Sequence, residues 1–218
     1  MDALGTGPLN ASICILAVDQ PSVSALAEKR PFAGYDEKLL EQKLLQAGLH
    51  ISDVRLELVA YQPCTPIEEA VTQTIQRLNG MPQLEVVVAL GETALQVLTG
   101  LVSIDKWHLS PLDTHAEFHV RKCIPTFSLK RLNSEYGLQL YLIKTLQRAK
   151  EAAKQPGHWQ RKPKNFLLNP HYETTMEVLK HLERQAILSV DIETGQGIIN
   201  TVGFAWSESD AIAIQTLP

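Results

Sequence analysis

Residues 85–94 have the sequence EVVVALGETA, and this stretch decides the fold class. After Glu85 the run is continuously apolar as far as Leu90, which is typical of a strand covered on both faces. Gly91 interrupts the run, and residues 92–98 then favour a helix that Gly100 ends. A buried strand that turns directly into a helix is the repeating unit of a parallel α/β sheet.

The same alternation of strand and helix extends along most of the chain on either side. Apolar runs predict the strands, and apolar residues at helical spacing predict the helices. The expected strands are residues 12–18, 56–61 and 123–127, and the expected helices are residues 38–48, 65–78 and 136–154. We therefore predict an α/β domain in which helices cover both faces of a parallel sheet.

The last third of the chain has a different organisation. Residues 155–164 contain two prolines, one glycine and three basic side chains, so we interpret them as a basic linker. This divides the chain into a domain over residues 1–154, the linker, and a second, incomplete domain over residues 165–218. In the second domain we expect a buried strand over residues 186–190 that runs into Asp191, followed by an antiparallel meander.

Composition limits the class of protein. The 218 residues are 44% hydrophobic and 20% charged. The N-terminus shows no basic stretch followed by an apolar one, and no apolar run approaches the length of a spanning helix, so we expect neither a signal peptide nor a membrane span. We therefore expect a soluble protein of the bacterial or infected-host cytoplasm with no membrane partner. The net charge of -4 argues against a strongly electrostatic nucleic-acid binder, although the acidic excess lies entirely in residues 191–218.

Cys14, Cys64 and Cys123 lie far apart, and no two of them form a C-x-x-C pair. This spacing suggests neither a disulfide framework nor a zinc or iron–sulfur site. We expect buried free thiols.

Asp191 and Glu193 are the most informative acidic residues. Side chains at i and i+2 of a strand share one face, where two carboxylates can bind a divalent cation such as Mg²⁺ or Mn²⁺. With Thr194 and the Val202–Ala205 sequence VGFA, residues 187–217 resemble the first exonuclease motif of family A DNA polymerases and the ribonuclease D group.

This resemblance implies the start of a ribonuclease H-like 3′–5′ exonuclease domain, an α+β fold. Asp191 and Glu193 would be the catalytic acids and the metal ligands. The family takes further metal-binding residues from two later motifs, and these residues are not among the 218. We therefore expect weak metal binding and no useful exonuclease activity from this chain alone.

The first domain has a resemblance of its own. RPFAG at residues 30–34, AGL at 47–49, VVVALGETA at 86–94 and PTF at 125–127 occur in the order and at the spacing of family 4-type uracil-DNA glycosylases. The resemblance implies a three-layer αβα sandwich with a parallel sheet.

The resemblance also places a base pocket, at Asp19, Phe32, Glu57 and Ser128. Asp19 occupies the position of the carboxylate that places the attacking water in the family, although both glycines of that loop are absent. Glu57 replaces the asparagine that reads uracil, and Ser128 replaces the histidine that stabilises the leaving base. Phe32 would stack on an extruded base. These replacements predict a scaffold without base-excision chemistry, and the missing cluster cysteines predict no iron–sulfur cluster.

Basic residues near the expected strand end and linker are candidate DNA contacts. They are Lys122, Lys130, Arg131, Arg161 and Lys162.

Together the two resemblances indicate the N-terminal part of a bacteriophage-type family A DNA polymerase. The leading hypothesis is a DNA replication or repair protein whose glycosylase-like domain binds DNA or a replication partner without excising a base. Two alternatives stay open: an active uracil-DNA glycosylase, and a non-enzymatic protein-interaction adaptor.

Overall fold

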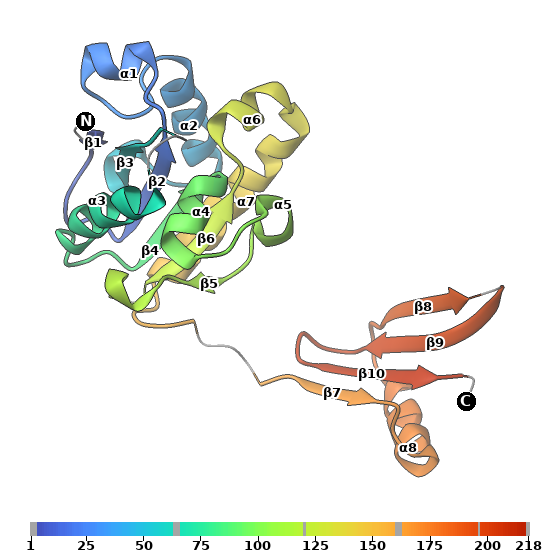
Figure 1. Ribbon diagram of the computed structural model, residues 1–218. Helices are drawn as coiled ribbons and strands as arrows, with labels where there is room; N and C mark the ends of the chain where they lie inside the picture. The colour runs from blue at the N-terminus through green and yellow to red at the C-terminus, as the bar shows by residue number, and fades with distance from the viewer. Residues whose placement is uncertain (1–3, 63–65, 120, 160–162, 196, 217–218) are drawn as a thin grey trace. The chain divides into compact units, whose positions relative to one another are not determined.

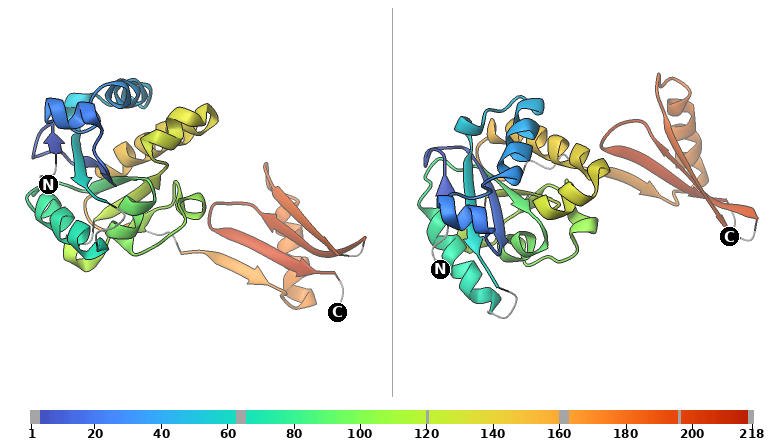
Figure 2. Two further views of the ribbon diagram at one scale, coloured as in Figure 1. Left: turned by 45° about the horizontal axis from the view of Figure 1, so that its top comes forward. Right: turned by 90° about the horizontal axis from the view of Figure 1, so that it is seen from above.

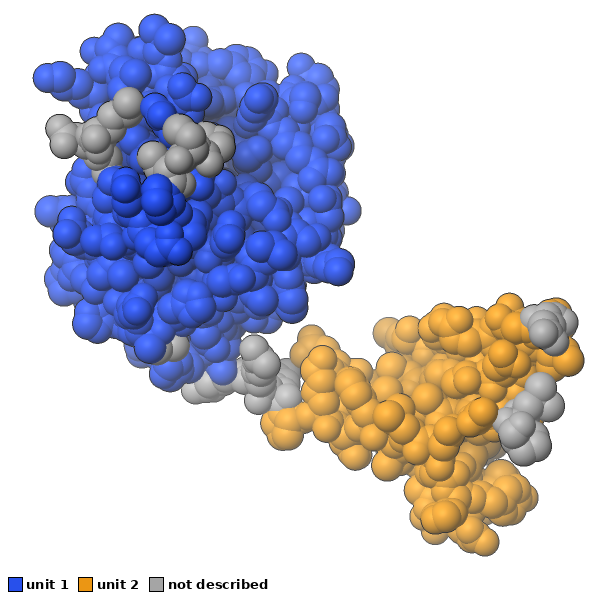
Figure 3. All heavy atoms as spheres, viewed as in Figure 1, with its two compact units in different colours: residues 1–159 blue, residues 160–218 orange. Residues whose placement is uncertain are grey.

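The structure is a computed structural model that describes residues 4–62, 66–119, 121–159, 163–195 and 197–216 (Figure 1). The chain forms two compact units, residues 1–159 and residues 160–218, which we call unit 1 and unit 2 (Figure 3). Residues 155–159, expected to begin the linker, belong to unit 1. The backbone nitrogen of Gly157 donates to Glu85 at 3.2 Å, and Trp159 Nε1 donates to the carbonyl of Leu112 at 2.7 Å.

Unit 1 is an α/β domain built on one six-stranded sheet. Its strands are β1 (Leu4–Thr6), β2 (Ile13–Asp19), β3 (Arg55–Ala60), β4 (Val86–Leu90), β5 (Leu112–Asp113) and β6 (Lys122–Thr126). Its helices are α1 (Val23–Glu28), α2 (Tyr35–Gln46), α3 (Ile67–Asn79), α4 (Glu92–Thr99), α5 (Ile104–Trp107), α6 (Leu129–Ser134) and α7 (Gln139–Ala153). Short 3-10 turns occupy Ile51–Asp53, Ala116–Phe118 and Tyr136–Leu138.

The sheet has the order β1-β3-β2-β4-β6-β5 and is mixed. The four central strands are parallel, as the apolar runs predict, but β1 and β5 pair antiparallel at the two edges. The expectation of a purely parallel sheet is therefore wrong. The two edge strands have three and two residues, which is too short for any periodicity to reveal them.

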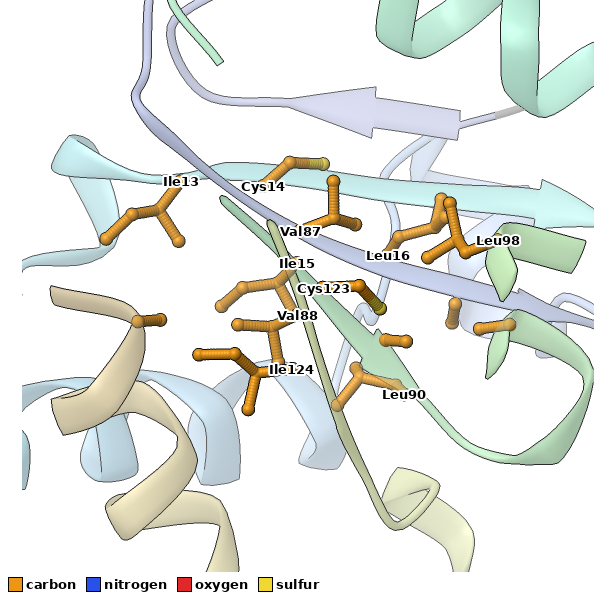
Figure 4. Close-up of a cluster of buried hydrophobic side chains, with 14 of the residues drawn as sticks. Ile13, Cys14, Ile15, Leu16, Val87, Val88, Leu90, Leu98, Cys123 and Ile124 are labelled. Carbon is orange, nitrogen blue, oxygen red and sulfur yellow. The ribbon is translucent and has the colours of Figure 1, made fainter. Parts of the chain in front are cut away.

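Helices cover both faces of the sheet. Helix α2 contacts α7, and helix α3 contacts α4. Each of these two pairs packs against the central strands (Figures 1 and 2). In Figure 4, Leu16 of β2 lies toward Leu98 of α4, whereas Ile15, Val88 and Ile124 gather on the other side of the sheet. Both faces of the central strands are therefore buried, which explains their continuous apolar runs.

Cys14 and Cys123 lie inside this core as free thiols (Figure 4), which confirms the expectation for these two residues. Burial raises the pKa of both thiols, so they stay protonated. Cys64 lies outside the described residues.

Unit 2 is a four-stranded sheet with one helix. It consists of β7 (Asn165–Leu168), α8 (Tyr172–Leu182), β8 (Ser189–Gly195), β9 (Ile198–Ala205) and β10 (Asp210–Gln215), in the sheet order β7-β10-β9-β8. The expected meander is confirmed, because β9 pairs antiparallel with both β8 and β10. The strand β7 pairs parallel with β10.

The expectation of a buried strand over residues 186–190 is wrong. The strand β8 begins at Ser189, and its residues from Ser189 to Thr194 are exposed. It is an edge strand that pairs with β9 alone. Among the described residues of unit 2, only Leu182 and Ile212 are buried apolar side chains.

None of the helices in the described part of the chain combines the length and apolarity of a membrane-spanning segment.

Candidate functional site

A hollow of unit 1 lies where the central strands end. The chain leaves β2 toward β3 but leaves β4 toward β6, on the opposite side, so the loops after β2 and β4 diverge. In open α/β sheets this divergence creates a crevice at the carboxyl ends of the strands, where ligands characteristically bind. A pocket of about 480 Å³ occupies this position. Its lining residues are Ala17, Asp19, Gln20, Pro21, Ser22, Ala25, Phe32, Asp36, Leu58, Leu90, Ser128, Leu129, Lys130 and Asn133.

Apolar side chains form the floor and walls of the pocket. Ala17, Leu58 and Leu90 come from β2, β3 and β4. Phe32 is 6% exposed and therefore forms a fixed wall instead of a projecting ring. Flat apolar walls with polar groups around them suit an aromatic heterocycle.

Phe32 reaches this wall through an unusual backbone conformation. Its φ is +56°, and Lys29 and Gly34 in the same loop have φ values of +52° and +85°. A bulky residue in the left-handed region costs about 1–3 kcal/mol and persists only where its surroundings enforce it, most often at functional sites. Here the burial of Pro31, Phe32 and Ala33 holds the conformation.

Two carboxylates line the pocket. Asp19 is the last residue of β2, and its Oδ1 accepts from the backbone nitrogen of Gln20 at 2.7 Å. Asp36 lies in the first turn of α2, and its Oδ1 accepts from Asn133 Nδ2 at 2.7 Å. The Oδ2 atoms of both aspartates have no hydrogen-bond partner within the described part of the chain.

Asp36 and Asn133 were missed by the sequence analysis. Their hydrogen bond joins α2 to α6 across 97 positions of sequence, so only the folded sheet brings them together. An acidic residue in the first turn of a helix is favoured by the helix dipole alone. The sequence therefore gives no indication that Asp36 belongs to a site.

Ser128 is positioned by two features of neighbouring loops. Its Oγ caps α6 by accepting from the backbone nitrogen of Arg131 at 3.3 Å. Gly91, with φ +88°, packs beside it, and a Cβ at residue 91 would lie 3.0 Å from the Cβ of Ser128. The glycine after β4 is therefore required for this close approach.

The candidate cations occupy different environments. Lys130 is exposed at the pocket and has no partner among the described side chains. Arg131 does not line the pocket; it pairs with Asp105 at 2.9 Å and Glu135 at 3.0 Å, and it lies 4.6 Å from the centre of the Phe127 ring. Hydrogen bonds to Glu135 and Asp105 raise the pKa of Arg131.

The assignment of Lys122 as a DNA contact is wrong. Lys122 begins β6, at the end of the sheet opposite the pocket, and is 2% exposed. Its Nζ donates to the carbonyls of Ala152, at 2.9 Å, and Gln155, so it caps the C-terminal end of α7. Arg161 and Lys162 lie outside the described residues.

The assignment of Glu57 to the base pocket is also wrong. Glu57 lies in the middle of β3, is completely buried and does not line the pocket. Its Oε1 accepts from Arg55 Nε at 2.8 Å and lies 2.6 Å from Arg55 Nη2. Strand residues alternate between the faces of the sheet, so the Glu57 side chain lies on the same face as its ion-pair partner Arg55, two residues earlier.

The acids of unit 2 lie within a strand and not at its end. Asp191 and Glu193 are in β8 on one face, and a bulge follows between Glu193 and Thr194. Within the described ranges of the chain, no group of three or more His, Cys, Asp or Glu side chains could hold a metal ion. Two carboxylates alone do not make the enclosed oxygen-ligand set that Mg²⁺ or Mn²⁺ requires in a catalytic site.

The pocket thus unites Asp19, Phe32, Ser128 and Lys130 from the sequence analysis. A scan against protein-family models finds no match to this chain, and a search of curated proteins finds none either.

Proposed function

We propose that this chain is part of a DNA replication or repair protein, and that unit 1 binds single-stranded DNA with one base in the pocket. The observation that carries the proposal is the pocket at the strand ends, which combines the Phe32 wall with the unpaired Lys130. Bases present apolar faces to such walls, and a lysine at the rim can contact a phosphate.

Base excision is not part of the proposal. Cleavage of the glycosidic bond leaves negative charge on the departing base, and catalysis needs donors aimed at that charge. The polar lining instead includes the carboxylates of Asp19 and Asp36, which disfavour an anion there. Ser128 accepts from Arg131 at the start of α6, and its one hydroxyl proton can supply a single hydrogen bond to the departing base.

Unit 2 supports the replication context through its resemblance to the exonuclease family. In that family, Mg²⁺ or Mn²⁺ supplies an activated water and stabilises the phosphate charge. Asp191 and Glu193 are the residues that would contact the metal, but they lack a third ligand in the described structure. We therefore assign no nuclease step to this chain.

The test is binding of fluorescent single-stranded DNA, measured by anisotropy over a range of salt concentrations. Lys130→Ala is expected to weaken binding and to reduce the salt slope of log K by about 0.7, the value of one phosphate contact on single strands. Lys154→Ala is the matched control, because Lys154 lies at the C-terminal end of α7, away from the pocket.

Two results overturn the proposal. One is the absence of DNA binding at low salt. The other is an equal loss of affinity in the Lys130 and Lys154 variants, which would place binding elsewhere. Release of free uracil from DNA by the purified chain would instead favour the glycosylase alternative, with Asp19 as the group that positions water.

A further inference from the structure

We infer that the pocket selects a base with an exocyclic amino group, such as cytosine or adenine, over uracil or thymine. The inference rests on the proposed function and deepens it, because it names the chemical class of base that the same pocket takes. It departs from the uracil preference that the glycosylase resemblance implies.

Hydrogen bonds hold the two carboxylates of the pocket in place. The backbone nitrogen of Gln20 holds Asp19, and the amide of Asn133 holds Asp36, each at 2.7 Å. Each contact uses Oδ1 and leaves Oδ2 without a partner among the described residues. Asp19 is exposed and Asp36 is half-buried, so water can reach both carboxylates. An ionised carboxylate only accepts hydrogen bonds, so a ligand that displaces this water must supply a donor in its place.

The bases differ in the groups along their polar edge. At the position where cytosine carries an amino group, uracil carries a carbonyl oxygen. The amino group can donate to a carboxylate, whereas the carbonyl would face it as a second acceptor. The N3–H of uracil can also donate, but carbonyl oxygens flank it on both sides. A base that sets a carbonyl against these carboxylates displaces water without replacing its hydrogen bonds, so a mismatched group lowers the affinity.

The other residues of the pocket lining differ from the two carboxylates in their chemistry. The apolar walls, including Phe32 and Leu90, contact any base face and do not distinguish one base from another. Among the described residues, Lys130 is the one cation that lines the pocket, and a phosphate contact carries no sequence information. Ser22 and Ser128 accept from backbone nitrogens at helix starts, and each hydroxyl keeps one proton that can donate to whichever acceptor lies nearest. Gln20 and Asn133 carry amides, which both donate and accept, so Asp19 and Asp36 are the acceptor-only side chains of the lining, and we assign base selection to them.

The experiment compares short single-stranded oligonucleotides of deoxycytidine and deoxyuridine of equal length, bound to the full chain. These pyrimidines have the same ring size and differ only along one edge, at position 4 (amino or carbonyl) and at N3 (acceptor or N–H donor), so their affinity ratio reports how the pocket contacts this edge. We expect the deoxycytidine strand to bind about tenfold more tightly. Asp19→Asn and Asp36→Asn introduce an amide donor at nearly the same volume, and each is expected to lower this ratio toward one.

Glu117→Gln is the control substitution, because Glu117 is an exposed acid on the 3-10 turn Ala116–Phe118, outside the pocket lining. It should leave the ratio unchanged, and circular dichroism of each variant confirms that it is folded. Equal or tighter binding of the deoxyuridine strand by the unmodified chain overturns the inference. If Lys130→Ala still weakens binding in that case, the proposed function stands. No binding of either strand overturns the proposed function, and the inference with it.

Discussion

Replacement of Glu57 by leucine is expected to destabilise unit 1 by about 3–5 kcal/mol, the usual cost of removing one partner from a buried ion pair. Glu57 is fully buried, and the side chain of its partner Arg55 is 11% exposed. Without Glu57, the guanidinium keeps one described hydrogen bond, from Nη1 to the carbonyl of Gly7 at 2.6 Å. A buried charge without a counter-charge accounts for the size of the effect.

The assay is thermal and urea unfolding followed by circular dichroism. Each kcal/mol shifts the Tm of a domain of this size by about 2–4 °C, so the variant should melt about 6–20 °C lower. Replacing Arg55 and Glu57 together by leucine removes both charges and fills the same space. We expect the double variant to recover most of the stability, because hydrophobic replacements of buried pairs are often neutral.

Glu68→Leu is the matched control, because Glu68 is exposed on α3 and its substitution should change stability by no more than about 0.5 kcal/mol. Two results would refute the reasoning: a loss below about 1 kcal/mol for Glu57→Leu, or a double variant no more stable than the single one. A change in base preference on Glu57→Gln without a loss of stability would restore Glu57 to the pocket.

Three further outcomes are expected. Lys122→Met should lower stability by about 1–3 kcal/mol through the lost bonds to the end of α7, while DNA affinity in the anisotropy assay stays unchanged; a weakened affinity in a fully folded variant would contradict this. Cys14 and Cys123 should resist a thiol-specific disulfide reagent until urea unfolds the chain. The reaction is followed by absorbance in a Cys64→Ser variant, and rapid reaction in buffer would contradict their burial. Hydroxyl hydrogen bonds, first from Ser207, hold the pKa of Asp210 below its usual value. Ionised Asp210 therefore contributes stability above its unfolded pKa, and this contribution is lost as the pH falls through the folded pKa. Ser207→Ala should raise that pKa in an NMR titration, and an unchanged titration would exclude the hydrogen bond as the cause.

The central sheet was predictable because its signals are local. The run from Val86 to Leu90 and the glycine after it determine a buried strand and the turn into α4 without reference to the rest of the chain. The edge strands β1 and β5 were not predictable, because they have three and two residues and are defined by their pairing with β3 and β6. Tertiary pairing, and not propensity, creates them.

The pocket was predictable only in part, for a related reason. Asp19 and Ser128 immediately follow apolar runs, so the sequence alone places them near strand ends. Asp36 depends on a contact with Asn133, which lies far away in sequence. The place of Lys122 was not predictable, because a charged side chain suggests exposure, whereas its stem is buried and its amine caps a helix.

The sparsely covered sheet of unit 2 determines what calorimetry of this chain will record. The heat-capacity increment of unfolding follows the apolar surface that becomes newly exposed. In unit 2 that surface is already largely in water, since Val190 and Ile192 are 52% and 50% exposed in the folded state. Its transition should therefore be broad and shallow, and the sharp excess-heat peak should belong to unit 1. A substitution in β8 can then abolish the structure of unit 2 and leave the calorimetric midpoint where it was.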